Sequence, residues 1–323
     1  MKTVLITAIG SMSSKAAIDS LKKKGFRVIG TNYYPKEYIA EAYMVDQFYN
    51  VPRYNCEVEY IKTLCSIIAK EEVDYVIPLT DPEVDVINEY REKVERTGTI
   101  ICISNYETIN VCRDKLDIAT MLSENIAEIR TIPTINFDDI SELSKYPLVC
   151  KKRNGRSSED LHIIHDYDEW IFIKDRIALD NYIVQRFIQG NVVCVDVIRN
   201  INTKQVIAIP RKELLRTSNG AGLSVFVFKD EKLQNLCFKI SECLDINGCV
   251  NFEFILDENG EYWFMECNPR LSGGIAFSCI VGYDYIINHI RCFTAEDILD
   301  ELSEFDNKYI VKQYTEIVTK VEK

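Results

Sequence analysis

The chain has 323 residues, enough for roughly two or three folded units, and it contains no run of about 20 apolar residues that could cross a membrane. Its formal charge of −12 argues against nucleic acid as a partner. The twelve cysteines lack a Cys-x-x-Cys pair and lie mostly in apolar stretches, which indicates reduced core residues of a cytoplasmic protein rather than disulfides or a zinc site. With three histidines, a histidine-based metal site or catalytic triad is not expected.

Residues 1–104 alternate between strand and helix patterns. Strands are expected at 3–8, 27–31, 75–79 and 99–104, and helices at 14–24, at about 58–70 and from Asp81 to Gly98. This order predicts a parallel sheet with helices on both faces. The loop 9–15 follows the first strand, where open α/β sheets bind ligands. It lacks a Gly-x-Gly-x-x-Gly or P-loop pattern, so nucleotide binding at this loop is only weakly supported.

A second unit is expected to begin at about residue 105. Its elements are a helix from Arg113 to about Ser123, a strand at 147–152, a polar loop at 153–158 and a returning strand at 161–165. A lysine on an apolar strand before such a loop can point at a phosphate while backbone N–H groups surround it. Any hairpin could show this pattern, so the loop alone is weak evidence.

The third unit contains a β-hairpin that carries acidic residues. It follows strands at 192–200 and 205–210, a glycine-rich loop at 217–223 and a helix at 230–244. Two strand-like runs, 249–256 and 261–268, flank the polar loop 257–260. With Leu256 opposite Glu261, alternation makes Glu253 and Glu266 diagonal neighbours, roughly 7–8 Å apart. The residues expected on their shared face are Asn251, Glu253, Tyr262, Phe264, Glu266 and Asn268.

The two acids on one face of an apolar hairpin favour a bound cation, because unpaired buried charge is costly. Oxygen ligands without His or Cys suit Mg²⁺, which proteins usually bind through one or two carboxylates together with substrate phosphates. Arg270 follows on the turn Pro-Arg-Leu-Ser-Gly-Gly, where a guanidinium would stabilise charge on a transferred phosphoryl group. From spacing alone, a surface hairpin with its glutamates in water is an equally good interpretation.

The pattern of Glu253 followed by Glu266-Cys-Asn268-Pro-Arg270-Leu-Ser-Gly-Gly resembles the metal-binding core of the ATP-grasp superfamily, which includes carboxylate–amine ligases, biotin carboxylase and the carbamoyl-phosphate synthase large subunit. The resemblance implies that Glu253, Glu266 and Asn268 bind Mg²⁺, or Mn²⁺ in its place, bridging the phosphates of ATP. It also implies that Arg270 assists acyl-phosphate chemistry.

The resemblance extends to the nucleotide site. It implies that Lys115 and Lys151 bind the phosphates, and that the loop with Gly155, Ser157 and Ser158 closes over them. Adenine would bond backbone groups of Gln185, Arg186 and Phe187. These residues could also be ordinary polar residues of an edge strand.

Three further assignments follow from the resemblance. Val192 stands where many members carry a ribose-binding Glu, so Asp196 becomes the candidate for the sugar. Arg211 resembles an additional phosphate contact, with a solvated strand end as the alternative. At the end of a first-unit strand, candidates for the acceptor site are Thr80, Asp81 and Glu83, which would otherwise form a helix cap.

We therefore expect an α/β chain with an N-terminal Rossmann-like parallel-sheet domain (1–104), an ATP-grasp small subdomain (105–184), a large subdomain (185–293) and a C-terminal tail (294–323). The implied activity is that of an ATP- and Mg²⁺-dependent ligase, which activates a small-molecule carboxylate as an acyl phosphate for attack by an amine or similar nucleophile. The alternatives are phosphorylation of bicarbonate or carbamate, as in carbamoyl-phosphate synthase, and a nucleotide-binding regulator without catalysis. No membrane or nucleic-acid partner is expected, and a homodimer is left open.

Overall fold

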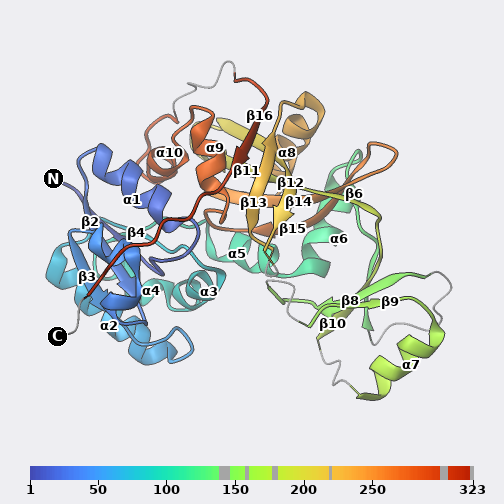
Figure 1. The fold of residues 1–323 in the computed structure, drawn as a ribbon, viewed down its shortest axis with the longest axis horizontal. Coiled ribbons are helices and arrows are strands. Elements are labelled where there is room, and N and C mark those ends of the chain that lie inside the picture. The colour runs from blue at the N-terminus through green and yellow to red at the C-terminus, as the bar shows by residue number, and fades with distance from the viewer. Residues whose placement is uncertain (138–145, 157–159, 177–180, 218–219, 299–304, 321–323) are drawn as a thin grey trace.

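Three β-sheets organise the computed structural model, which describes residues 1–323 except 138–145, 157–159, 177–180, 218–219, 299–304 and 321–323. The first sheet lies in the N-terminal part of the chain. The second is a small sheet at the opposite end of the molecule, and the third and largest lies between them (Figure 1). This arrangement confirms the α/β fold expected from the sequence.

The first sheet is parallel and has the strand order β3-β2-β1-β4-β5. Its strands are β1 (Thr3–Ile6), β2 (Arg27–Asn32), β3 (Gln47–Asn50), β4 (Tyr75–Ile77) and β5 (Ile100–Ile101). Its helices are α1 (Ser14–Lys23), α2 (Glu57–Glu71), α3 (Asp81–Glu89) and α4 (Arg91–Glu95), with short 3₁₀ turns η1 (Lys36–Tyr38) and η2 (Ala40–Tyr43). Strand β3 was not expected, because its residues are at most half-buried and lack an apolar run.

Alternation along β1 explains why helices cover both faces of this sheet. Leu5 packs into the core that contains Leu64 of α2. Its neighbours Val4 and Ile6 face the opposite way, into a core shared with α1 and with residues of the third sheet and the helices that follow it. The first sheet is therefore joined to the rest of the molecule by a continuous apolar core, which fixes its strand ends beside the large sheet.

The second sheet is antiparallel and has the order β7-β10-β8-β9. Its strands are β7 (Thr134–Asn136), β8 (Leu148–Lys152), β9 (His162–Ile164) and β10 (Tyr182–Arg186), and helix α7 (Tyr167–Arg176) packs on it. Helix α7 was not expected from the sequence. Strand β10 runs across the boundary that the sequence suggested between residues 184 and 185.

The third sheet has seven strands in the order β16-β13-β12-β11-β14-β15-β6. They are β6 (Arg130–Thr131), β11 (Gly190–Arg199), β12 (Val206–Arg216), β13 (Gly222–Val227), β14 (Gly248–Asp257), β15 (Tyr262–Asn268) and β16 (Lys308–Val311). Helix α8 (Glu231–Cys243) and the pair α5 (Tyr106–Arg113) and α6 (Lys115–Asn125) contribute to the core on one face. Residues 106–131 therefore pack with the large sheet, although the sequence assigned them to the second unit.

The other face of the large sheet is covered by α9 (Ile275–Ile280), α10 (Tyr285–Arg291) and the first domain. Beyond β16 the chain crosses back to the first domain, where the Thr319 hydroxyl donates to the Glu37 carbonyl at 2.7 Å (Figure 1). On the way, the Lys312 ammonium donates to the Gly273 carbonyl at 3.0 Å. Across the described ranges, no helix has the length and apolar character needed to span a membrane.

Candidate functional site

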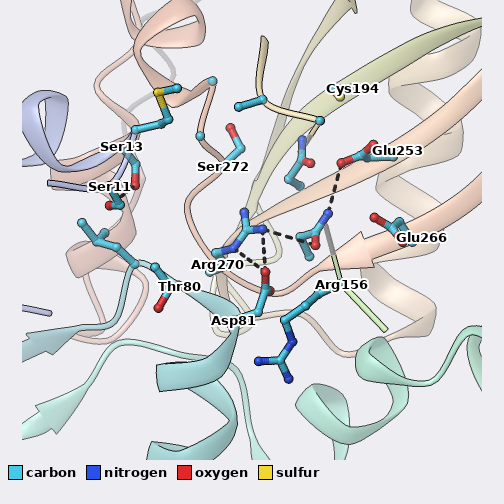
Figure 2. Close-up of a pocket in the computed structure, with 18 of the residues that line it drawn as sticks. Ser11, Ser13, Thr80, Asp81, Arg156, Cys194, Glu253, Glu266, Arg270 and Ser272 are labelled. Carbon is cyan, nitrogen blue, oxygen red and sulfur yellow. Dashed lines mark hydrogen bonds and ion pairs between the residues drawn. The ribbon is translucent and has the colours of Figure 1, made fainter. Parts of the chain in front are cut away.

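A cleft of about 580 Å³ lies where the three sheets meet. Its walls are the loops at the carboxyl ends of β1, β2, β3 and β4, the Lys151 region of the small sheet, and the cleft-facing side chains of β11, β12, β14 and β15. Figure 2 shows the middle of this cleft, where Arg270 and Asp81 lie between the serines of the loop after β1 on one side and the acids of the hairpin on the other. The cleft thus brings together residues that are up to 266 positions apart in the chain, from Ala8 to Gly274.

The β14–β15 hairpin places Glu253 directly opposite Glu266, and not diagonally as the sequence suggested. Near the turn, Leu256 pairs with Tyr262 rather than with Glu261. The turn is thus one residue longer on the β15 side than expected, because the Asp257 carboxylate accepts the N–H groups of Asn259 and Glu261 at 2.9 Å and fixes both in the turn.

A β-bulge at Met265 then changes which face the following residues occupy. Before the bulge, Tyr262 and Phe264 point into the apolar core, so the expectation that they share a face with the acids was wrong. After it, Glu266 and Asn268 line the cleft. Without the extra residue, strict alternation would have buried both groups in the core.

The two acids differ in their electrostatic surroundings. Burial and the Glu266 carboxylate raise the pKa of Glu253 to about 7. Burial also acts to raise the pKa of Glu266, but Lys115 and Lys151 outweigh it and hold that pKa below its usual value. The Asn268 amide donates to Glu253 at 3.3 Å, and the Lys115 ammonium lies 3.6 Å from Glu266. Two facing carboxylates, one of them with a raised pKa, fit a hard cation placed between them, which would favour the ionised form of both.

The described residues contain no group of three or more His, Cys, Asp and Glu side chains that could hold a metal by themselves. A metal at the acid pair would therefore rely on Glu253, Glu266, the Asn268 amide and oxygen atoms from a bound ligand. This donor set fits Mg²⁺, which normally keeps waters and shares phosphate oxygens with its substrate.

Lys115 and Lys151 approach the acid pair from two different elements. Lys115 is the first residue of α6, which Asp114 caps by accepting the N–H groups of Leu116 and Asp117 at 3.0 Å. Its ammonium donates to the Gly155 carbonyl at 2.5 Å, so the glycine of the polar loop lies beside this lysine. Lys151 projects from β8, and burial lowers its pKa to about 8. Ser157 and Ser158 lie outside the described residues.

The low pKa of Lys151 predicts pH-dependent nucleotide binding. Below pH 8 the ammonium is charged and attracts phosphate, whereas above pH 8 the free protein loses that charge. The bound phosphates favour the charged form, so affinity should fall by up to about tenfold per pH unit as pH rises above 8. Calorimetric titration with ADP between pH 7 and 10 measures this loss. In Lys151→Arg, whose guanidinium stays charged, the fall should be absent.

The expected adenine segment lies apart from the cleft, since Gln185, Arg186 and Phe187 do not line it. The Gln185 side chain is buried and donates to the Thr134 hydroxyl at 2.8 Å. The N–H groups of Arg186 and Phe187 already donate to the carbonyls of Pro133 and Pro147. A base placed here could therefore accept no hydrogen bond from these two N–H groups. Val192, in contrast, does line the cleft.

Asp196 and Arg211 form a buried ion pair at 2.5 Å, with exposed side-chain fractions of 0% and 2%. The Ser278 hydroxyl also donates to Asp196, at 2.6 Å. This placement removes Asp196 from contact with a sugar, because its carboxylate lies beneath the cleft wall. The remaining guanidinium nitrogens of Arg211 donate to Glu213 at 3.1 Å and to Ser272 at 3.2 Å. Arg211 therefore holds the wall of the cleft together through three of its five N–H donors.

Arg270 projects into the cleft from the turn after β15. Its guanidinium pairs with Asp81 at 2.7 Å and also contacts the Asn268 amide oxygen at 3.3 Å (Figure 2). The acceptor-site candidates divide accordingly. Asp81 contacts Arg270 of the turn after β15. Glu83 is instead buried and accepts hydrogen bonds from the hydroxyls of Thr7, Thr80 and Tyr60, as a satisfied core acid would.

Sequence reasoning missed two arginines of the site. Arg216, at the end of β12, pairs with Glu253 at 3.2 Å and donates to the Gly220 carbonyl at 2.8 Å. Arg156, in the polar loop after β8, pairs with Asp85 of α3 at 2.6 Å. A register shift in β12 brings Arg216 to the cleft, and no signal in the sequence marks it. The basic residues in the loop 153–158 were a usable signal for Arg156.

Two family models match the chain. The model described as "PylC-like, N-terminal domain" matches residues 4–102, and the model described as "ATP-grasp in the biosynthetic pathway with Ter operon" matches residues 178–317. The chain is also 25% identical over 288 residues to the carbamoyl phosphate synthase large chain of Methanothermobacter thermautotrophicus. That alignment covers 82% of this chain and 26% of the relative, so the chain spans about a quarter of the relative's length.

Solved structures share the fold. Biotin carboxylase from Campylobacter jejuni, in complex with β,γ-ATP, superposes with a TM-score of 0.77 at 18% identity, covering 95% of this chain and 74% of the other. The L-amino acid ligase from Bacillus licheniformis gives a TM-score of 0.71 at 16% identity, covering 91% and 74%. The family matches and the curated relative support the ATP-grasp superfamily, and the ATP-grasp model itself matches residues 178–317, while the solved structures show a shared fold.

Proposed function

We propose that the protein is an ATP- and Mg²⁺-dependent ligase that phosphorylates a carboxylate to an acyl phosphate and joins it to an amine or similar nucleophile. The observation that carries this proposal is the convergence of Glu253, Glu266, Asn268, Arg270 and two lysines on one cleft. A nucleotide-binding role alone would not need Arg270 between the acid pair and the loops of the first domain.

The residues divide the work by charge. Lys115 and Lys151 neutralise the phosphates of ATP, which otherwise repel an attacking carboxylate. Arg270 would bind the carboxylate or the acyl phosphate formed from it, exchanging its contact with Asp81 for the substrate. The carboxylate oxygen attacks the γ-phosphorus, ADP leaves, and the amine then attacks the acyl carbon and displaces phosphate. This chemistry depends on positioning and charge stabilisation and needs no side-chain nucleophile.

Magnesium would be held by Glu253, Glu266 and Asn268, and when bound it supplies charge neutralisation at the phosphate oxygens. The Glu253 carboxyl has a pKa of about 7 without a cation, because burial and Glu266 disfavour its charge. A divalent cation favours the ionised form of both acids, so metal binding should release protons near neutral pH.

Phosphate release tests the proposal directly. The full chain is incubated with ATP, Mg²⁺ and a panel of amino acids and short peptides, and the products are identified by mass. We expect substrate-dependent release of phosphate and ADP with formation of an amide. ATP binding without turnover on any substrate would instead support a regulator, and would contradict the ligase proposal.

A second candidate is phosphorylation of bicarbonate or carbamate. The similarity to a carbamoyl phosphate synthase large chain favours it, although the aligned region is only 26% of that protein. A chain with one such module would need a partner for the complete reaction. Formation of carbamoyl phosphate from bicarbonate and ammonia, with no amide product from the panel, would favour this reading.

The cysteines support a reducing compartment such as the cytoplasm. All twelve are free thiols, and most of them are buried in the cores.

A further inference from the structure

Arg53 differs from the other arginines that line the cleft. Five arginines do so, and four of them pair with a carboxylate: Arg156 with Asp85, Arg211 with Asp196, Arg216 with Glu253 and Arg270 with Asp81. Within the part of the chain that the structure describes, Arg53 has no carboxylate partner. Its guanidinium instead lies against two rings, 5.1 Å from the centre of Tyr33 and 5.7 Å from that of Tyr54.

Arg53, Tyr33 and Tyr54 lie at the edge of the first sheet that also carries Asp81, the partner of Arg270. Tyr33 follows β2, Arg53 follows β3, and Asp81 follows β4. In the strand order β3-β2-β1-β4, three strand spacings separate β3 from β4. At about 4.8 Å per spacing, Arg53 lies on the order of 10–15 Å from the Asp81–Arg270 pair.

The loop after β1 occupies the space between these two positions. Ser11 and Ser13 line the cleft there, and they lie on the far side of Asp81 and Arg270 from the acids Glu253 and Glu266 (Figure 2). The cleft is thus a continuous track that runs from the acid pair, past Arg270 and the two hydroxyls, to Arg53.

We propose that Arg53, flanked by Tyr33 and Tyr54, binds a terminal carboxylate or phosphate group of the substrate that is joined at Arg270. This inference rests on the proposed ligase function and adds the class of substrate. A guanidinium presents paired N–H donors that match a carboxylate or phosphate, and aromatic faces hold its plane at low entropic cost. The other four arginines each already pair with a carboxylate, and of these only Arg270 is proposed to exchange its partner, Asp81, for the reacting end of the substrate.

The separation along the track sets the length of the substrate. An extended chain spans about 3.3–3.6 Å per residue, so 10–15 Å corresponds to roughly three or four residues. A single amino acid is too short to reach from Arg270 to Arg53. The proposed substrate is therefore an elongated molecule, such as a short peptide or a conjugate of that length, with an anionic end.

The test uses alanine peptides of two, three and four residues as probes. Each length is prepared in three forms, which end in a free carboxylate, in an amide, or in an aminoethyl phosphate that replaces the carboxylate. Binding to the full chain in the presence of Mg²⁺ and ADP is measured by calorimetry. We expect the acid or the phosphate forms of the longer probes to bind about tenfold to a hundredfold more tightly than the amides. A preference for one anion identifies which of the two the site takes.

The variant Arg53→Ala should abolish the difference between anionic and amide probes and leave ADP affinity unchanged. Arg53→Lys should restore only part of it, because an ammonium cannot form the paired contact. Arg96→Ala is the matched control, since Arg96 is an exposed arginine of the same domain that pairs with Glu92. Equal affinities of anionic and amide probes in the unmodified protein, absence of binding by every anionic probe, or discrimination that survives in Arg53→Ala would overturn the proposal.

This result is separate from the test of ligase function. A chain that binds ADP but forms no product fails as a ligase, whatever its preference among probes. A chain that forms amides but treats acids and amides alike retains its ligase function and loses the Arg53 site.

Discussion

Glu266→Gln is expected to lower ATP-dependent turnover by about 10²–10³-fold. Glu266 faces Glu253 directly across the hairpin and lies 3.6 Å from the Lys115 ammonium. The amide would remove one of the two carboxylates proposed to hold magnesium, while the positive charges of Lys115 and Lys151 remain. Nucleotide binding through the lysines should therefore survive better than turnover. Phosphate release measures turnover, and calorimetry with ADP measures binding.

A second consequence separates a metal-site effect from general damage. The Glu266 charge raises the pKa of Glu253, so its removal should lower that pKa from about 7 and reduce the proton release that accompanies metal binding. The matched control is Glu261→Gln on the same hairpin. Glu261 lies in the turn region and pairs with Arg130 at 3.2 Å and with Lys232 at 3.5 Å, away from the cleft. Near-normal turnover in Glu266→Gln would contradict the metal role of the acid pair.

The sequence predicted the fold and the acid pair because both depend on local patterns. Alternating strands and helices in residues 1–104 require a parallel sheet, and an apolar hairpin with two acids requires a cation or water near them. The bulge at Met265 could not be predicted, because it leaves no turn residue or break in the apolar pattern. Its effect is to return Glu266 and Asn268 to the cleft face, after Tyr262 and Phe264 have pointed into the core.

Long-range pairing of charges was equally hidden. Asp196 and Arg211 were assigned to ATP from the family resemblance, as a sugar contact and a phosphate contact. A polar residue on an apolar strand looks the same in the sequence whether it binds a ligand or neutralises another residue, and only the register of β11 with β12 distinguishes the cases. Asp196 pairs with Ile209 in that register, which brings it within reach of Arg211 two residues along on the same face.

Arg211→Met is expected to lower the free energy of unfolding by about 3–5 kcal/mol. The guanidinium binds Asp196 and Glu213, both of which are almost fully buried, and its loss leaves two carboxylates without their cation. A Cβ on Gly274 would lie 2.8–2.9 Å from the guanidinium, so the Gly-Gly turn is packed directly on it. Urea denaturation measures the loss. Turnover should also fall, because the turn that carries Arg270 loses its support.

The partner acid provides the decisive comparison. In Arg211→Met combined with Asp196→Asn, one of the two stranded charges is removed, so the double variant should be more stable than Arg211→Met alone. Lys212→Met is the matched control, because Lys212 is the half-buried neighbour on the opposite face of the same strand, and its loss should change stability by less than about 1 kcal/mol. Were Arg211 a phosphate ligand and not a structural cation, Arg211→Met would weaken ADP binding with little change in stability, and Asp196→Asn would give no rescue. The buried geometry requires the opposite order of effects.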